Sequence, residues 1–512
     1  DGVQQWPCIT TISESALNSK ILWVGTDDGN VQVTRDGGAT WKIVVEKIPG
    51  VPKGTYVGRV VASRHAEGTA YVTFDGQRSN DFAVYVYTTT DYGETWKNIG
   101  GGLPQNNAVV RVIREHTRNA DLLFVGTEYG VYASWDRGAN WTRIKMNLPT
   151  ARVDDILIHP RDNDLVIGTH GRSIWILDDI TPLEQLNEKV LASDLFLFDV
   201  RPATSWRMWN RSWFSGNKEF IAPNPPYGAT VNFYLKNKLD DKERVRVSIL
   251  DKGGKSVREI TCGGPAPEAP AAGELAGLAL LRGAGGPTRC DAKPGINRVA
   301  WDLRQAMPMQ PAQDQQQQRG FFGMGRAPIV DPGEYTVKIA VVTAPGPGAG
   351  MAGGQAAPGK WETSRTIRVE DDPRVTLSDS DRAARRQALN QLMQLSGSAQ
   401  QAQRSITGLR TNLNNAIEGW KRPGAPRVSE DIRKAAEDLL KKVDEIYPQF
   451  GTLPSEAQPL GNAGPPLIER PTPLPQRVGR LLSNLDGYSA APAASELEAI
   501  KVLSDLVKAA GC

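Results

Sequence analysis

Long apolar runs are missing from this 512-residue chain, and so is an excess of charge of either sign. No stretch approaches the roughly 18 consecutive apolar residues that cross a bilayer, so no membrane span is expected. Lys and Arg number 60 against 57 Asp and Glu, which argues against a nucleic-acid binder or a polybasic membrane-surface protein. Hydrophobic residues still make up 40%. At roughly 150 residues per domain, about three domains with packed cores are expected.

Cysteine is scarce as well, with four residues and no pair at the spacing of a zinc ligand set. Neither a metal nor a cofactor is therefore expected. Cys262 and Cys290 flank an insert rich in Gly, Ala and Pro, and we expect a disulfide between them. Such a bond implies an oxidising, extracytoplasmic compartment. Cys8 and Cys512 could pair with each other, pair with another chain, or stay reduced.

A repeat is present in the first 180 residues. Three segments share one pattern of turn residues and a closing tryptophan: Thr34–Trp41, Thr89–Trp96 and Ser134–Trp141. Alternating apolar segments such as Ile21–Thr26 precede these turns, and a fourth copy near Leu165–Leu177 lacks the aspartate turn. A period of about 45 residues with several short strands per unit is typical of a β-propeller blade.

The chemistry of the repeated turn is structural. An aspartate at a hairpin tip accepts backbone N–H bonds, a glycine two residues later permits a positive φ, and the tryptophan buries a large surface between blades. These residues match the Asp-box, or BNR, motif, except that the third copy has Asn140 where threonine is usual. The predicted structural set is Asp36, Gly38, Trp41, Asp91, Gly93, Trp96, Asp136, Gly138 and Trp141.

Four blades are few for a closed propeller. We therefore expect residues 1–182 to be the four C-terminal blades of a larger one, with the remainder on an N-terminal fragment or a partner chain. The chain starts at Asp1 rather than Met, which favours processing or cutting from something longer. A four-bladed closure and self-association are the alternatives.

The periodicity changes after the repeats. Residues 183–228 form an expected connector with the aromatic cluster Trp206, Trp209 and Trp213, either a sugar-stacking platform or, as we favour, a packed plug. Residues 229–375 alternate as in an immunoglobulin-like β-sandwich interrupted by inserts rich in Gly, Pro or Gln.

The last part of the chain reads as helical. Residues 376–512 predict a helical bundle, with helices near 377–417, 429–447, 473–486 and 494–510. The predicted fold class is mainly β with an α tail: a partial Asp-box propeller, a sandwich and a bundle.

This order of parts resembles a family of secreted bacterial BNR-repeat proteins, sortilin-like and often named glycosyl hydrolases. Residues 168–179 resemble the last propeller strand of that family, and residues 299–304 with 332–335 resemble its FlgD-type Ig-like domain. The resemblance implies an extracytoplasmic location and a longer N-terminus. The glycosidase name does not establish the activity, because a fold hosts many functions.

A catalytic or binding site needs residues that differ from the repeated pattern. The candidates are Asp75, Asp154, Asp155, His170 and Arg172. Asp154 and Asp155 are adjacent on a strand, so their side chains point to opposite faces and cannot form one catalytic pair. No Ser-His-Asp order, phosphate-binding loop or dinucleotide loop stands out.

The histidines repeat with the blades. His65, His116 and His159 precede equivalent strands, which favours a turn role over a ligand cluster.

The function we expect is a binding or scaffold protein whose propeller holds a protein, peptide or glycan. The alternative is a polysaccharide-active glycoside hydrolase whose site is shared with the missing N-terminal half.

Overall fold

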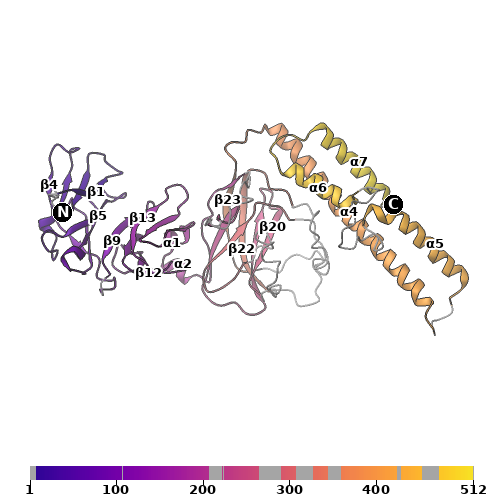
Figure 1. Ribbon diagram of the computed structural model, residues 1–512, viewed down its shortest axis with the longest axis horizontal. Helices are drawn as coiled ribbons and strands as arrows, with labels where there is room; N and C mark the ends of the chain where they lie inside the picture. Colours follow the sequence, from indigo (N-terminus) through magenta and orange to yellow (C-terminus); the bar gives the residue numbers. More distant parts are fainter. Residues whose placement is uncertain are drawn as a thin grey trace, which may run out of the picture. The chain divides into compact units, whose positions relative to one another are not determined.

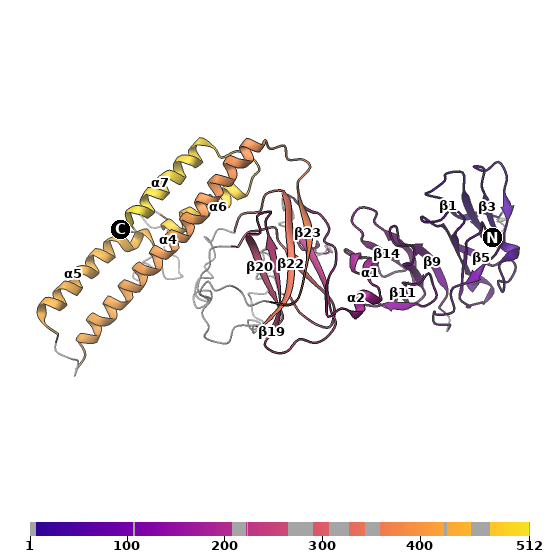
Figure 2. The same cartoon turned by 180° about the vertical axis from the view of Figure 1, so that it is seen from behind.

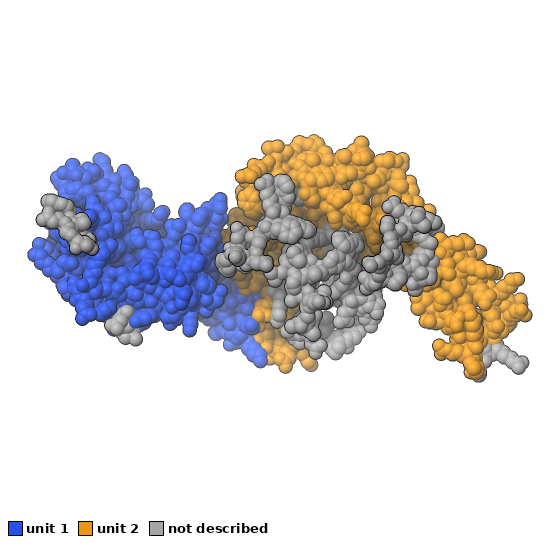
Figure 3. Space-filling model, viewed as in Figure 1, with its two compact units in different colours: residues 1–199, 232–238, 293–297 blue, residues 200–231, 239–292, 298–512 orange. Residues whose placement is uncertain are grey.

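The computed structural model describes residues 7–105, 108–206, 222, 224–264, 290–306, 327–343, 359–423, 428–451 and 472–510. Two compact units make up the chain, coloured separately in Figure 3. Unit 1 holds Asp1–Asp199 with two short later segments, and unit 2 holds most of the rest. Sheets dominate up to Asp371 and helices follow, so the predicted class of mainly β with an α tail is confirmed.

Unit 1 contains four antiparallel sheets in chain order, which we call blades 1 to 4 (Figure 1). Blade 1 is formed by β1 (Ile9–Glu14), β2 (Leu22–Thr26), β3 (Val31–Thr34) and β4 (Lys42–Ile43). Blade 2 is formed by β5 (Tyr56–Ala62), β6 (Ala70–Asp75), β7 (Tyr85–Thr89) and β8 (Lys97–Asn98). Blade 3 is formed by β9 (Val110–Glu115), β10 (Leu123–Thr127), β11 (Gly130–Ser134) and β12 (Thr142–Ile144). Blade 4 is formed by β13 (Val153–Ile158), β14 (Leu165–Thr169) and β15 (Ile174–Leu177). Short 3-10 turns lie at η1 (Val45–Lys47) and η2 (Gln77–Ser79).

Three apolar cores hold the blades together, one between each consecutive pair. Trp23 of blade 1 meets Trp96 of blade 2 edge to face, with ring centroids 6.1 Å apart. The core between blades 2 and 3 contains the buried Ile113, and the core between blades 3 and 4 contains the buried Phe124. Because strands present alternate residues to their two faces, each blade buries both faces when it has a neighbour on each side.

The repeated turn, which we call the aspartate turn, has the same hydrogen bonds in all three copies. In the second copy, Thr95 donates to Asp91 through its backbone N–H at 2.9 Å and its hydroxyl at 2.6 Å, and Thr89 donates at 2.8 Å. In the third copy the amide of Asn140 replaces the usual hydroxyl and donates to Asp136 at 2.7 Å. The departure from the motif therefore preserves the turn.

The aspartate turns of blades 2 and 3 also pack on the preceding blade. A Cβ added at Gly93 would approach Val44 of blade 1 to 2.9 Å, and one added at Gly138 would approach Ile99 of blade 2 to 2.9 Å. Trp141 donates its indole N–H to the carbonyl of Ile99 at 2.7 Å. The glycines are needed both for their positive φ and for this close approach.

Two further sheets follow along the chain. One has the order β17-β23-β22-β19-β20 and the other β16-β18-β21. Their strands are β16 (Leu195–Leu197), β17 (Ala203–Ser205), β18 (Ala229–Leu235), β19 (Glu243–Leu250), β20 (Ser256–Cys262), β21 (Gly295–Trp301), β22 (Gly333–Thr343) and β23 (Lys360–Asp371). Alternate residues of β19 and β22, such as Val247 and Ile339, are fully buried. This is the alternation expected of a sheet with one covered face.

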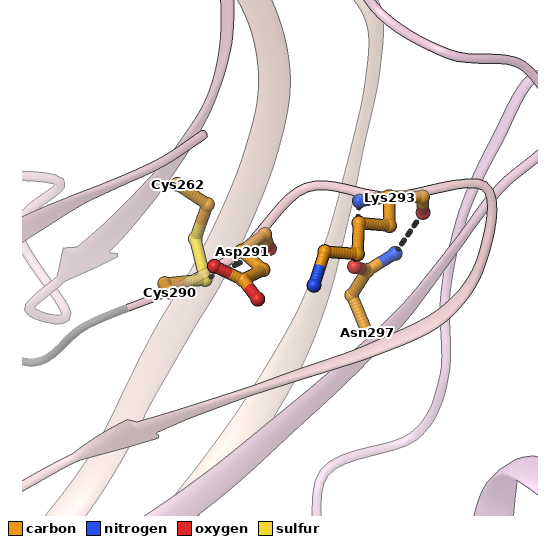
Figure 4. The surroundings of a disulfide bond; sticks show 5 residues. All are labelled: Cys262, Cys290, Asp291, Lys293 and Asn297. Carbon is orange, nitrogen blue, oxygen red and sulfur yellow. Dashed lines mark hydrogen bonds between the residues drawn. A yellow bond between two sulfur atoms is a disulfide. The ribbon is translucent and has the colours of Figure 1, made fainter. Parts of the chain in front are cut away.

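A disulfide joins Cys262, at the end of β20, to Cys290 (Figure 4). Gly263 donates its backbone N–H to the carbonyl of Cys290 at 3.0 Å, which fastens the same point a second time. The bond closes the chain across a sequence separation of 28 residues.

The C-terminal helices form where their periodicity predicted them (Figure 2). The helices of the chain are α1 (Thr181–Gln185), α2 (Glu188–Ala192), α4 (Asp379–Trp420), α5 (Glu430–Ile446), α6 (Leu474–Asp486) and α7 (Ala494–Ala510), with the 3-10 turn η4 (Tyr447–Gln449). Ser378 caps α4 by accepting the N–H of Asp381 at 3.1 Å. Leu392, Leu482 and Leu503 from α4, α6 and α7 share one core. Within the described ranges, no helix is long and apolar enough to cross a bilayer.

Candidate functional site: the bulge rim of the propeller

Strand register defines one rim of the four blades. The first strand of each blade shifts register once where it pairs with the second strand. The residues skipped by these shifts are Thr10, Gly58, Arg111 and Asp154. The corresponding positions along the second strands are Asp75, which ends β6, and Asp27, Glu128 and His170, which directly follow β2, β10 and β14. We call these eight positions the bulge rim. Bulges re-aim side chains and are frequent beside functional sites.

Blades 2 and 3 are joined at the bulge rim by one arginine. Arg111 contacts Glu128 of its own blade at 2.8 Å and reaches across to the carboxylate of Asp75 in blade 2. It also donates to the side-chain carbonyl of Gln77. The Asp75 side chain is only 8% exposed, so this ion pair is largely withdrawn from solvent. A guanidinium with its donors in a fixed fork suits such a bridge between two carboxylates.

Blade 4 carries a second, more open cluster at the bulge rim. His170 Nδ1 lies 3.2 Å from Asp154 Oδ2, and Arg152 Nε lies 2.8 Å from Asp154 Oδ1. The side chains of His170 and Asp154 are 66% and 42% exposed. A ligand can therefore contact this carboxylate and imidazole without a rearrangement of the backbone.

Asp155 belongs to a different group from Asp154. Its Oδ1 lies 3.1 Å from Arg59 of blade 2 and 2.9 Å from Arg114 of blade 3. Burial, followed by repulsion from Arg59, lowers the pKa of the Arg114 guanidinium, while Asp155 acts in the opposite sense. The two adjacent aspartates thus contact separate partners, and the structure does not bring them together as one pair.

The remaining candidates from the sequence are not part of the rim clusters. Arg172 is exposed, and its carbonyl accepts the indole N–H of Trp175 at 2.8 Å. Trp206 is 48% exposed. Trp209 and Trp213 lie outside the described residues, so the aromatic cluster as a whole is not placed.

The histidine turns are bonded to the backbone. His116 is fully buried; its Nδ1 accepts the N–H groups of Arg118 and Asn119, and its Nε2 lies 2.9 Å from Asn163 Oδ1. His159 Nδ1 accepts the N–H of Asp162 at 3.1 Å. Burial lowers the pKa of His116. Among the described residues no group of three or more His, Cys, Asp or Glu could hold a metal ion.

The sequence alone missed the arginines of the site: Arg59, Arg111, Arg114 and Arg152. For Arg111, a signal appears once the first strands of the four blades are aligned by register. At the bulge position, Arg111 replaces residues as unlike as Thr10, Gly58 and Asp154. This position therefore varies between repeats, as the residues of a site do, while Arg111 itself also bridges two blades.

Carboxylates of the rim clusters are arranged for charge pairing. Asp75 and Glu128 share Arg111, and Asp154 contacts Arg152 and His170. A glycosidase needs one carboxyl group that retains its proton beside the scissile bond and a second at a fixed separation. Carboxylates held by arginines are better suited to binding polar groups than to donating protons.

Unit 2 contains a shallow depression of about 460 Å³ lined in part by Lys252, Glu334 and Arg368. Its charges are of both signs, and its walls offer little apolar surface of the kind that ligand pockets use.

Comparison with known proteins supports the propeller. Residues 84–189 match the family model described as "Sortilin, neurotensin receptor 3" (Sortilin-Vps10). No curated protein matches the chain. This stretch, which runs from β7 into α2, is similar to the sortilin family, and the blades in it agree with a propeller fold.

Two solved structures show a weak likeness. One, described as "YCF48 bound to D1 peptide", has 17% identity and a TM-score of 0.26, covering 35% of this chain and 52% of that one. The other, "YCF48 from Cyanidioschyzon merolae", has 15% identity and a TM-score of 0.24, covering 46% of this chain and 70% of that one. The match thus spans about half the length of the first protein. Nothing about a ligand of this chain follows from either.

Proposed function

We propose that this chain is an extracytoplasmic binding or scaffold protein whose propeller holds a protein, peptide or glycan at the bulge rim. The observation that carries the proposal is the open cluster of Asp154, His170 and Arg152, at positions where the other blades carry different residues. It offers a carboxylate, an imidazole and a guanidinium on one exposed edge. Such a set suits the paired donors and acceptors of a peptide backbone or a sugar.

Preorganisation supports the proposal. The Arg111 bridge between Asp75 and Glu128 ties blade 2 to blade 3, so the rim beside the open cluster is braced. Recognition sites gain affinity when their side chains are held before the ligand arrives.

The alternative is a polysaccharide-active glycoside hydrolase that completes its site with further blades. Asp154 is more exposed than the rim carboxylates Asp75 and Glu128 and suits such a role better than they do. It would require a second carboxylate at about 5–5.5 Å for a retaining enzyme, or about 6.5–9.5 Å for an inverting one. We favour binding because Asp154 is paired with two basic side chains.

Location and organisation complete the proposal. The disulfide between Cys262 and Cys290 supports an oxidising compartment, since such bonds persist outside the cytosol. We propose residues 1–182 as propeller blades completed by an N-terminal fragment or partner chain, and residues 183–228 as a connector that also gives β16 and β17 to the following sheets. Residues 229–375 would form an Ig-like sandwich and 376–512 a helical bundle. The sandwich and bundle would dock the propeller to its assembly.

The test compares three proteins on arrays of peptides and of glycans. These are the wild type, the double variant Asp154→Asn with His170→Gln, and the control Asp121→Asn, which removes an exposed carboxylate paired with Arg137. We expect the double variant to lose the wild-type ligands and the control to keep them. Binding that survives in the double variant would contradict a site at the rim. Glycan cleavage that Asp154→Asn abolishes would establish the hydrolase instead.

A further inference from the structure

The first blade exposes the face that every other blade covers. Val57 and Val60 of blade 2 are 0% and 1% exposed because they pack on blade 1. Their register equivalents in blade 1, Ile9 and Ile12, are 64% and 63% exposed. Blade 1 therefore presents a finished blade-to-blade surface with no blade on it.

The tryptophan of the aspartate turn shows the same difference. Trp96 is 8% exposed against blade 1, whereas Trp41, its equivalent in blade 1, is 41% exposed. A Cβ added at Gly93 would meet Val44 of the preceding blade. A Cβ added at Gly38 would meet only Trp41 of its own turn.

The opposite end of the series is uncovered too. Gly126 of blade 3 lies against Val153 of blade 4, but the equivalent Gly168 has only its own strand neighbour Asp155 nearby. Buried positions on the same face of blades 1 and 3 are Val31, Val33, Val131 and Ala133, at 0–2% exposure. Exposed apolar residues on blade 4 are Leu157 at 55%, Ile174 at 68% and Ile176 at 58%.

Among the described residues, blade 4 also has one strand fewer than the other blades. Blades 1 to 3 each have four strands, whereas the sheet of blade 4 ends at β15. After β15 the chain turns away, and the N–H of Ile180 bonds to the carbonyl of Asn163 before α1 begins. An unpaired strand edge beside exposed isoleucines is a template for pairing with another strand.

We infer that a single propeller segment outside these residues covers both ends. It begins with one strand that pairs with β15 and completes blade 4, continues through whole blades, and ends with a blade that covers Ile9, Ile12 and Trp41. This inference rests on the proposed completion of the propeller and specifies the order of elements in the completing segment. The last blade places an aliphatic side chain against Gly38, as Val44 does against Gly93 and Ile99 does against Gly138.

A second copy of this chain fits the surfaces less well. Two copies could stack head to tail, because the two end faces are of complementary kinds. However, every described strand of unit 1 already belongs to a sheet, so a second copy has no described strand to offer to β15. A propeller segment that begins with one extra strand can cover the exposed faces of blades 1 and 4 and can also pair with the edge of β15.

Site-directed photo-crosslinking in the cells that make the protein tests the inference. A photo-crosslinking amino acid replaces Ile12 in one variant and Ile176 in a second, and Met146, which is 69% exposed in a turn, serves as the control position. Crosslinked peptides are then sequenced by mass spectrometry. We expect adducts at 12 and 176 but not at 146, with both adducts in one continuous propeller sequence. The adduct at 176 should lie N-terminal to the adduct at 12.

Three results would overturn the inference. These are adducts to this same chain in trans, adducts to sequences without blade repeats, and no adducts at either end. Combining Asp154→Asn with the crosslinking variants separates this inference from the binding proposal. Adducts that persist while array binding is lost support the inference and the rim together. If both the adducts and the array binding are unchanged, the result contradicts the binding site proposed at the bulge rim and leaves this inference standing.

Discussion

At the residue scale, the aspartate turns show how one carboxylate fixes a hairpin. Hydrogen bonds from Thr40 and Thr34 lower the pKa of Asp36 to about 2, and those from Thr95 and Thr89 do the same for Asp91. The charged form accepts every one of these bonds, so ionisation and turn geometry are coupled. This coupling makes the turns sensitive to acid.

Replacing Asp91 should weaken blade 2 in a pH-dependent way. Asp91→Ala should lower the free energy of unfolding by about 1 kcal/mol, as the loss of a comparable helix cap does. The pKa of Asp91 falls from 3.8 to about 2 on folding, so its stabilisation is present above pH 3.8 and is lost as the pH falls through about 2. Thermal melting between pH 5 and pH 2 measures the effect, with Asp91→Asn as the control that keeps one acceptor. Equal acid sensitivity in wild type and Asp91→Asn would refute the coupling.

His116 should make the propeller less stable in weak acid. Burial lowers its pKa below 6.5, so the unfolded chain binds a proton that the folded chain does not. Stability should therefore fall as the pH drops below about 6.5, by at most about 1.4 kcal/mol per pH unit. Melting temperatures at pH 7 and pH 5 for wild type and His116→Gln test this. The variant should be less stable at pH 7 but lose less on acidification. An identical loss in both proteins would show that His116 is not responsible.

At the scale of elements, a blade is stable through its neighbours. Strands such as β10 bury side chains on both faces, but only because blades lie on either side. Equivalent residues should therefore contribute more to the free energy of unfolding in the middle blades than in the blades at the two ends.

Two equivalent tryptophans give a matched comparison. Trp96→Ala should cost about 3–5 kcal/mol, because it opens a cavity beside Trp23 in a packed core. Trp41→Ala should cost less than about 1 kcal/mol in the isolated chain, because the ring is 41% exposed and lacks a blade to pack on. Urea unfolding followed by circular dichroism gives both values. Equal costs would mean that Trp41 is already packed and that the first blade is not an open end.

Within unit 2, Asp486 at the end of α6 joins that helix to α4 and to the isolated bridge between Arg304 and Ile329. Asp486 Oδ2 lies 2.7 Å from Arg304, and its Oδ1 lies 3.7 Å from Arg385 and accepts the N–H of Ile329. Asp486→Asn should cost about 3 kcal/mol, since it leaves buried arginines without their counter-charge. The control Asp444→Asn, at a more exposed pair with Arg410, should cost less than about 1 kcal/mol. Chemical unfolding compares them, and similar costs would show that Asp486 is not a fastening point.

Local patterns could be predicted, whereas long-range pairing could not. The turn around Asp91 is bonded within seven residues, and α5 follows from apolar spacing, so both are evident in the sequence. The Arg304–Asp486 pair spans 182 residues. The bulge position of Arg111 depends on the register of β9 against β10. Neither interaction leaves a local trace.

At the scale of the whole molecule, the disulfide should stabilise unit 2 through its unfolded state. Closing a loop across 28 residues is worth about 3–4 kcal/mol by the chain-entropy relation. Cys262→Ser with Cys290→Ser should lower the urea midpoint of unit 2, as should a reductant on the wild type. The control is Arg137→Ala, which removes an exposed side chain paired with Asp121. No change in the midpoint would show that the bond contributes nothing to stability.

The central claim is that these four blades are one part of a closed propeller. The direct measurement is native mass spectrometry of the protein isolated from its source without denaturation. The account predicts a species heavier than 55.7 kDa, with the added mass made of further blade repeats, whether covalently continuous or not. A lone species of 55.7 kDa, or a whole multiple of it, would contradict the claim.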